Sequence, residues 1–127
     1  INKRLDLFFK HDNNGYTLEQ QLDMICANLM LLMRKKNIDS LYITGSQMTE
    51  EINRSLSIIG TCLKKHDISF MIEKTSLCTV ESLEMFAKAE GVLFIEQMNK
   101  SLNDDILKEV ECCKKYDVDN LGFVIVE

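Results

Sequence analysis

The residues best placed for chemistry are Gly45, Ser46, Gln47 and Met48, which join a short apolar run to a helical pattern. The helix expected from Thr49 would point its N-terminus at this turn. Free N–H groups and the helix dipole make such an end a binding site for anions. The sequence therefore allows an anion site here, although an ordinary connection between strand and helix is the interpretation that we favour.

Other reactive side chains lack convincing partners. Glu73 and Glu96 follow two apolar runs and could form an acid/base pair, but solvated strand ends are the favoured interpretation. Ser46 has no obvious His or Asp partner, because His66 falls at the far end of the next helix, so we expect no hydrolase triad. Cys78 is a loop thiol, and reactive-cysteine chemistry there is a minor alternative. We therefore expect no catalytic residue.

The cysteines and histidines do not indicate a metal site. Both histidines, His11 and His66, are isolated in the sequence, so a Cys/His zinc site is not expected. The cysteines are odd in number, contain no CxxC motif and mostly fall inside helical patterns, which is typical of reduced, partly buried thiols in a cytoplasmic protein. They are Cys26, Cys62, Cys78, Cys112 and Cys113.

Length and charge limit the class of protein. A chain of 127 residues corresponds to one domain. The net charge of −5 argues against a nucleic-acid partner, because neutralising phosphates takes clustered Lys and Arg. No apolar run approaches the roughly 20 residues of a membrane-spanning helix, so we expect a cytoplasmic location. Because the chain begins at Ile1 rather than at Met, an upstream segment could tether it to the inner face of the membrane.

Short apolar runs alternate with helical patterns along the chain. The runs are continuously apolar, as in parallel strands that are buried on both faces, and parallel strands need helical crossovers. Thr17 and Gln20 form a capping-box signature at the first helix. We predict a three-layer α/β fold with a four-stranded parallel sheet in one domain, residues 16–127, after a lead-in segment, residues 1–15. The expected strands are 41–44, 69–72, 92–95 and 123–126, and the expected helices are 17–36, 49–65, 79–89 and 101–116.

The order of these features resembles the bacterial P-loop tyrosine kinases, the cytoplasmic partners of chain-length determinants in capsule and exopolysaccharide export. Residues 17–73 resemble the family's series of helix, Asn-containing turn, strand, phosphate loop, helix and strand. The stretch AKAEGVLFIE, from Ala87, resembles the family's "ADGVLLVV" segment. The resemblance extends over residues 17–127 and implies a fold derived from the P-loop proteins.

The loop departs from the family's phosphate-binding pattern, GxxxxGK[ST]. In the alignment that the resemblance implies, Ile52 takes the lysine position and Asn53 replaces the hydroxyl that holds Mg²⁺. Thr49 and Glu51 stand where glycines are needed, and Glu50 with Glu51 would face the phosphates. We therefore expect no ATP and no other cofactor in this degenerate region, which consists of Gly45, Ser46, Gln47, Met48, Thr49, Glu50, Glu51, Ile52 and Asn53.

The family's Walker-B strand is missing from this alignment, because too few residues separate Glu73 from Ala87. Without that strand, the first two strands can pair directly, and the predicted sheet order becomes 2-1-3-4, as in flavodoxin-like folds. The switch point then lies between strands 1 and 3, where open α/β sheets bind their ligands.

These features predict a non-catalytic, kinase-like domain that acts as a regulatory or docking module in bacterial capsular and exopolysaccharide biosynthesis and export. Its partner would be a protein of the export complex or a second copy of itself. One alternative is a small α/β enzyme that binds a nucleotide or a phosphorylated sugar at the switch point. Another is an interaction module unrelated to polysaccharide export. In the lead-in, Leu5, Phe8 and Phe9 either pack on the domain or form a helix that contacts a partner or a membrane.

Overall fold

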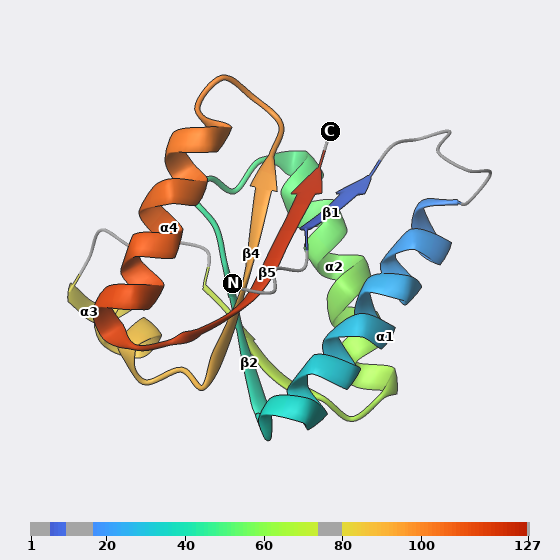
Figure 1. Ribbon diagram of the computed structural model, residues 1–127. Coiled ribbons are helices and arrows are strands. Elements are labelled where there is room, and N and C mark those ends of the chain that lie inside the picture. The colour runs from blue at the N-terminus through green and yellow to red at the C-terminus, as the bar shows by residue number, and fades with distance from the viewer. Residues whose placement is uncertain (1–5, 10–16, 74–79, 127) are drawn as a thin grey trace.

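The computed structural model describes residues 6–9, 17–73 and 80–126, which form a parallel sheet with helices on both faces (Figure 1). The strand order is β1-β5-β4-β2-β3, and every adjacent pair is parallel. The strands are β1 (Asp6–Phe9), β2 (Ser40–Thr44), β3 (Ser69–Ile72), β4 (Gly91–Gln97) and β5 (Asp119–Val126). The helices are α1 (Leu18–Lys36), α2 (Glu50–Lys65), α3 (Val80–Ala87) and α4 (Leu102–Tyr116).

The predicted order of the four expected strands, 2-1-3-4, is confirmed as β3-β2-β4-β5. The sheet has a further strand, β1, which the sequence analysis did not predict. It lies in the expected lead-in segment and pairs with the end of β5, from Asp6 beside Phe123 to Phe9 beside Val126. Phe8 and Phe9 are thus part of a strand and not of a helix, while Leu5 lies outside the described residues.

Local signals place the helix ends. At the start of α1, the Thr17 N–H donates to Gln20 Oε1 over 2.9 Å and the Gln20 N–H donates to Thr17 Oγ1 over 3.1 Å, so the predicted capping box is present. The helix ends at Asn37, whose left-handed φ of 57° stops the helical repeat. Thr49 caps α2 in the same way by accepting from the Ile52 N–H. The expected cap of the third helix, Thr79, lies outside the described residues.

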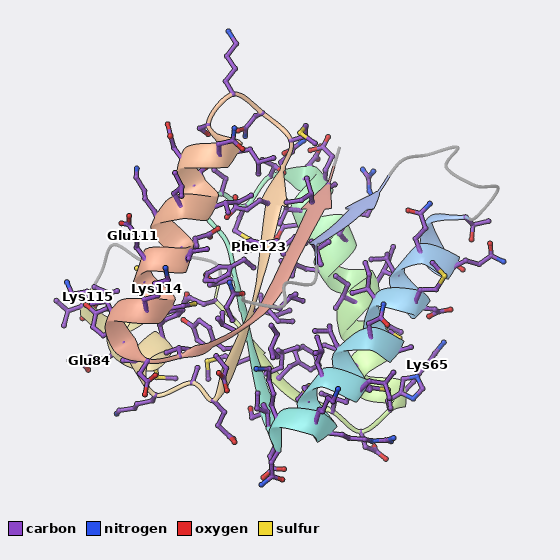
Figure 2. The ribbon with its side chains drawn as sticks, viewed as in Figure 1. Lys65, Glu84, Glu111, Lys114, Lys115 and Phe123 are labelled. Atoms are coloured by element: carbon purple, nitrogen blue, oxygen red, sulfur yellow. The ribbon has the colours of Figure 1, made fainter. Side chains whose placement is uncertain are left out.

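The sheet separates two apolar layers. Helices α1 and α2 cover one face of the sheet, and the larger of the two core clusters lies between them and the sheet. Helices α3 and α4 cover the other face, where the second core cluster lies (Figure 1). A bulge between β4 and β5 lets Leu121 join the α1/α2 layer and Phe123 the α3/α4 layer, with Gly122 at a φ of 130° between them. Phe123 stacks on Phe94 with ring centroids 5.4 Å apart, between the sheet and α4 (Figure 2).

In the part of the chain that is described, no helix combines the length and the apolar character that crossing a membrane requires.

Candidate functional site at the carboxyl ends of β2 and β4

The switch point of the sheet lies between β2 and β4, as predicted. From β2 the chain runs to β3 on one side, and it then crosses to β4 on the other side of β2. Ligands of open α/β sheets bind beyond the carboxyl ends of the strands at such a point. Here Ser46 is the second residue after β2, and Glu96 stands near the end of β4.

Glu96 binds the loop that follows β2. The Ser46 N–H donates to Glu96 Oε2 over 2.8 Å, and the Ser46 hydroxyl donates to Glu96 Oε1 over 2.5 Å. The Glu96 side chain is only 2 % exposed, so the expectation of a solvated strand end is wrong for this residue. The expectation that Ser46 has no Asp partner is wrong as well, because Asp105 Oδ2 lies within 3.2 Å of its hydroxyl. The Glu96 carboxylate therefore occupies the donors that a bound anion would use.

Gly45 allows this close approach of the loop to β4. A Cβ atom at residue 45 would overlap the backbone carbonyl oxygen of Ile95. Backbone atoms cannot move aside as a flexible side chain can, so only glycine fits. The glycine thus serves the contact between two backbones, and this contact brings Ser46 within reach of Glu96.

Helix α4 adds a second carboxylate to the site. Asp105 Oδ2 lies 3.2 Å from the Ser46 hydroxyl and 3.0 Å from the Ser101 hydroxyl. The Ser101 hydroxyl also lies 2.9 Å from Asn99 Oδ1. Because a hydroxyl has one proton, each serine donates to one of its neighbours at a time. Ser101 was expected to start the fourth helix, but its side chain makes no capping bond and turns to Asp105 instead.

Glu109, one turn further along α4, joins Glu96 and Asp105 to form a cluster of three carboxyl groups, the carboxyl cluster. It is 6 % exposed and hydrogen-bonded to Glu96. Burial raises the pKa of Glu109 to about 11, with the Glu96 hydrogen bond and the charges of Glu96 and Asp105 as further causes. Glu109 is therefore protonated at neutral pH, and its O–H donates to the Glu96 carboxylate. Among the described residues, its Oε1 atom has no hydrogen-bond partner.

Glu73 does not join this cluster. It follows β3, so β2 lies between it and Glu96, and strands are about 4.8 Å apart. Its backbone N–H donates to the Ile43 carbonyl, and its backbone carbonyl accepts from the Thr44 hydroxyl. Its charge acts on the buried Tyr42, whose pKa is raised to about 12, first by burial and then by Glu73. The acid/base pair considered from the sequence is thus not formed; Glu96 pairs with Glu109.

The remaining residues of the degenerate loop have structural roles. Ile52, at the aligned lysine position, is fully buried in the α1/α2 layer. Met48 packs against the same layer. Glu50 and Glu51 are exposed in the first turn of α2, where carboxylates are favourable to the helix dipole. Of the residues of the degenerate loop, Ser46 alone contributes its side chain to the contacts with Glu96 and Asp105. The other loop residues are Gly45, Gln47, Thr49 and Asn53, of which Gln47 and Asn53 are exposed.

The α4 residues of the cluster were missed, although the sequence contained a signal. Leu102, Glu109 and Cys113 are buried and recur at helical spacing on one side of α4. Side chains three or four residues apart share a helix face, so an acid within that apolar stripe indicated a buried carboxyl. Its partner, Glu96, comes from a distant strand and could not be read from this spacing.

The described residues contain no group of three or more His, Cys, Asp and Glu side chains arranged to hold a metal ion. A hollow of about 330 Å³ lies at the opposite edge of the sheet, where α1 and α2 end, and its lining includes Arg34, Asp39, His66 and Asp67.

Comparison with models of protein families gives no match to this chain, and comparison with curated proteins gives none either.

Proposed function

We propose that this chain is a non-catalytic, kinase-like domain that docks to a protein partner in bacterial capsular and exopolysaccharide biosynthesis and export. The observation that supports a non-catalytic role is that the Glu96 carboxylate accepts hydrogen bonds from the Ser46 N–H and hydroxyl. The polysaccharide setting is supported by the resemblance of residues 17–127 to the P-loop tyrosine kinases.

The electrostatics of the switch point oppose a phosphorylated ligand. A phosphate at this turn would have to displace Glu96 from Ser46 and then lie beside Glu96 and Asp105. Two like charges about 4 Å apart repel by about 4 kcal/mol at an effective dielectric constant of about 20. Glu50 and Glu51 add negative charge at the start of α2. This cost disfavours the alternative of an enzyme for nucleotides or phosphorylated sugars.

The outer face of α1 is the surface that we assign to the partner. Met24 and Leu31 are 47 % and 62 % exposed, and Ala27 and Asn28 between them are exposed too. Met24, Ala27 and Leu31 lie along one side of the helix at this spacing and form an apolar strip, the α1 strip, with the polar Asn28 beside it. Large exposed apolar side chains that gather in this way are typical of interaction surfaces.

The non-catalytic role requires that the chain does not bind ATP, and this is tested by titrating the chain with ATP and Mg²⁺ in a calorimeter. The proposal expects no heat of binding at millimolar nucleotide. Magnesium-dependent binding that is lost in an Asn53→Ala variant would refute it, because the turn would then hold a nucleotide despite the Glu96 carboxylate.

The docking role is tested by co-purification with the cytoplasmic part of a chain-length determinant, with a P-loop tyrosine kinase of the same system, and with a second, differently tagged copy of the chain. A complex with one of these is expected, and Leu31→Glu should abolish it. Leu107→Glu on α4 is the matched control, because Leu107 is similarly exposed at 60 %. Failure of all three partners to bind, or equal loss in both variants, would contradict the proposed docking.

A further inference from the structure

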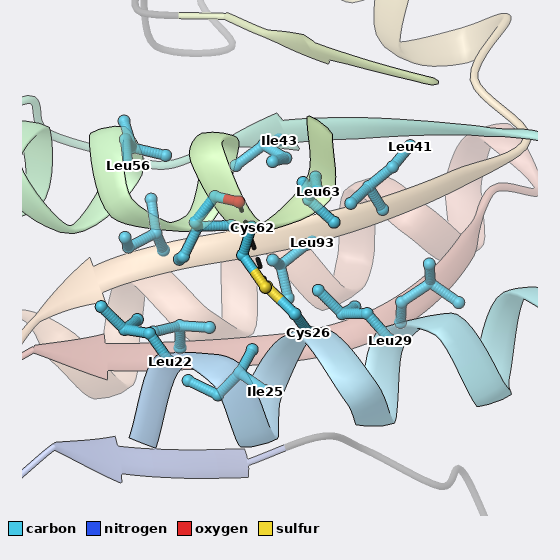
Figure 3. Close-up of a cluster of buried hydrophobic side chains, with 14 of the residues drawn as sticks. Leu22, Ile25, Cys26, Leu29, Leu41, Ile43, Leu56, Cys62, Leu63 and Leu93 are labelled. Atoms are coloured by element: carbon cyan, nitrogen blue, oxygen red, sulfur yellow. Dashed lines mark hydrogen bonds between the residues drawn. The ribbon is translucent and has the colours of Figure 1, made fainter. Parts of the chain in front are cut away.

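Two buried thiols face each other between α1 and α2. Cys26 is 0 % exposed and Cys62 is 5 % exposed, and both are free thiols. Figure 3 shows the sulfur atoms of the two side chains side by side. Cys26 comes from the middle of α1 and Cys62 from the last turns of α2, so the contact joins two helices of the same layer.

The surrounding groups hold the two sulfur atoms in this position. The Cys26 thiol lies 3.9 Å from the Ile59 carbonyl oxygen, and the Cys62 thiol lies 3.5 Å from Asp23 Oδ1. Both acceptors belong to the two helices themselves. The thiols are packed among apolar core side chains that include Leu22, Leu29 and Leu63 (Figure 3).

We propose that a hydroperoxide converts Cys26 and Cys62 into an intramolecular disulfide that links α1 to α2, so that the packing of these helices responds to oxidation. This inference is independent of the docking role, because it rests on the thiol contact alone.

The reaction has two steps, and Cys62 is the first thiol to react. Cys62 is the less buried thiol; burial raises its pKa and Asp23 adds to this, while the contact with Cys26 and the Lys65 charge act in the opposite direction. Its sulfur attacks the peroxide, so that an S–O bond forms, the O–O bond breaks and water leaves. The Cys26 sulfur then attacks the sulfenic sulfur of Cys62, the S–S bond forms, the S–O bond breaks and a second water leaves. Two thiols and one hydrogen peroxide thus give one disulfide and two waters.

Burial makes the first step slow at neutral pH. The pKa of both thiols is raised, mainly by desolvation, and the thiolate is the reactive form. While the pH stays below the pKa of Cys62, each additional pH unit increases the thiolate fraction about tenfold. The rate of crosslinking should therefore keep increasing above about pH 9, where an exposed thiol with an ordinary pKa of about 8.5 is already mostly ionised.

Cys112 and Cys113 provide the matched control. Cys113 is 5 % exposed, like Cys62, and burial raises its pKa to about 12. Its nearest cysteine in sequence is Cys112, the preceding residue of α4. Adjacent residues of a helix do not face each other, so these two thiols are not placed to form a disulfide.

The test uses the folded chain with Cys78→Ser, which removes a thiol that lies outside the described residues. This chain is treated with hydrogen peroxide at several pH values, and the products are identified by peptide mass spectrometry. A Cys26–Cys62 peptide is expected to accumulate faster as the pH increases, to persist in Cys113→Ala and to be absent in Cys62→Ala. The linked chain should melt at a higher temperature, and a reductant should reverse this increase. Circular dichroism of each variant reports whether it is folded.

Three results would overturn the inference: sulfinic acid at Cys62 with Cys26 left unmodified, a disulfide that involves Cys112 or Cys113 instead, or no Cys26–Cys62 peptide before the chain unfolds. Because the measurement needs no partner protein, loss of the docking proposal would leave its result unaffected.

Discussion

Replacing Glu109 with glutamine should make the protein more stable at neutral pH, although the native side chain is buried and hydrogen-bonded. Glu109 has a raised pKa in the folded chain, about 11, against an ordinary value of 4.5. Between these values the folded state keeps the proton and the unfolded state has lost it. Stability falls with pH wherever the folded state binds more protons than the unfolded state. The native carboxyl therefore reduces stability increasingly as the pH rises above 4.5.

The expected magnitude follows from this proton balance. Each pH unit in the interval is equivalent to about 1.4 kcal/mol, so the cost at pH 7 is about 3 kcal/mol. This figure requires only that the folded pKa of Glu109 lies above 7. Glutamine has nearly the same shape and can donate to Glu96 through its amide, but it carries no titrating proton. Glu109→Gln should thus be more stable than the native chain by up to about 3 kcal/mol at pH 7 and about equal to it near pH 4.5.

Urea unfolding of both proteins at several pH values between about 5 and 8 measures this difference. The stability difference between the two proteins should grow by about 1.4 kcal/mol per pH unit. Glu111→Gln is the control, because Glu111 is an exposed carboxylate on the outer side of the same helix (Figure 2). A difference that does not change with pH would refute the reasoning, because Glu109 would then ionise alike in the folded and unfolded states.

Three further substitutions, measured by urea unfolding, test contacts of the loop after β2 and the packing of α2. Gly45→Ala should cost several kcal/mol or prevent folding, because its Cβ would overlap the Ile95 carbonyl oxygen; native stability would contradict this contact. Gly60→Ala, with its Cβ 3.4 Å from Phe70, should be neutral or gain up to about 1 kcal/mol from helix propensity, and a large loss would contradict that packing. Ser46→Ala should cost about 2 kcal/mol by removing a hydrogen bond to a carboxylate, whereas an unchanged stability would show that this bond contributes nothing.

Local signals made much of the fold predictable. Continuous apolar runs such as Leu41–Thr44 indicate strands that are buried on both faces, and β2 is buried at four of its five residues. The capping pair Thr17 and Gln20 marks the start of α1, because it involves groups only three residues apart. The α/β class and the order of four strands followed from such signals together with the resemblance and the rules for parallel sheets.

The candidate site was predictable only in part. Ser46 and Glu96 were both considered from the sequence, but they are fifty residues apart, and nothing local shows that they meet. Their contact depends on the parallel pairing of β2 with β4 and on the close approach of the two backbones that Gly45 permits. Glu109 was missed because its effect depends on which strand residue α4 places opposite it.

The sequence by itself determined the α/β class and the cap of the first helix, because periodicity, capping and crossover rules act over short stretches of chain. The strand order, and with it the switch point, also depended on the resemblance to the P-loop tyrosine kinases. Only the tertiary structure decided that β1 pairs with β5, that Glu96 contacts both Ser46 and the protonated Glu109, and that Cys26 lies beside Cys62. These contacts join residues far apart in the chain. Burial among them removes water from carboxyls and thiols, and this desolvation changes their proton affinity in a way that no local pattern encodes.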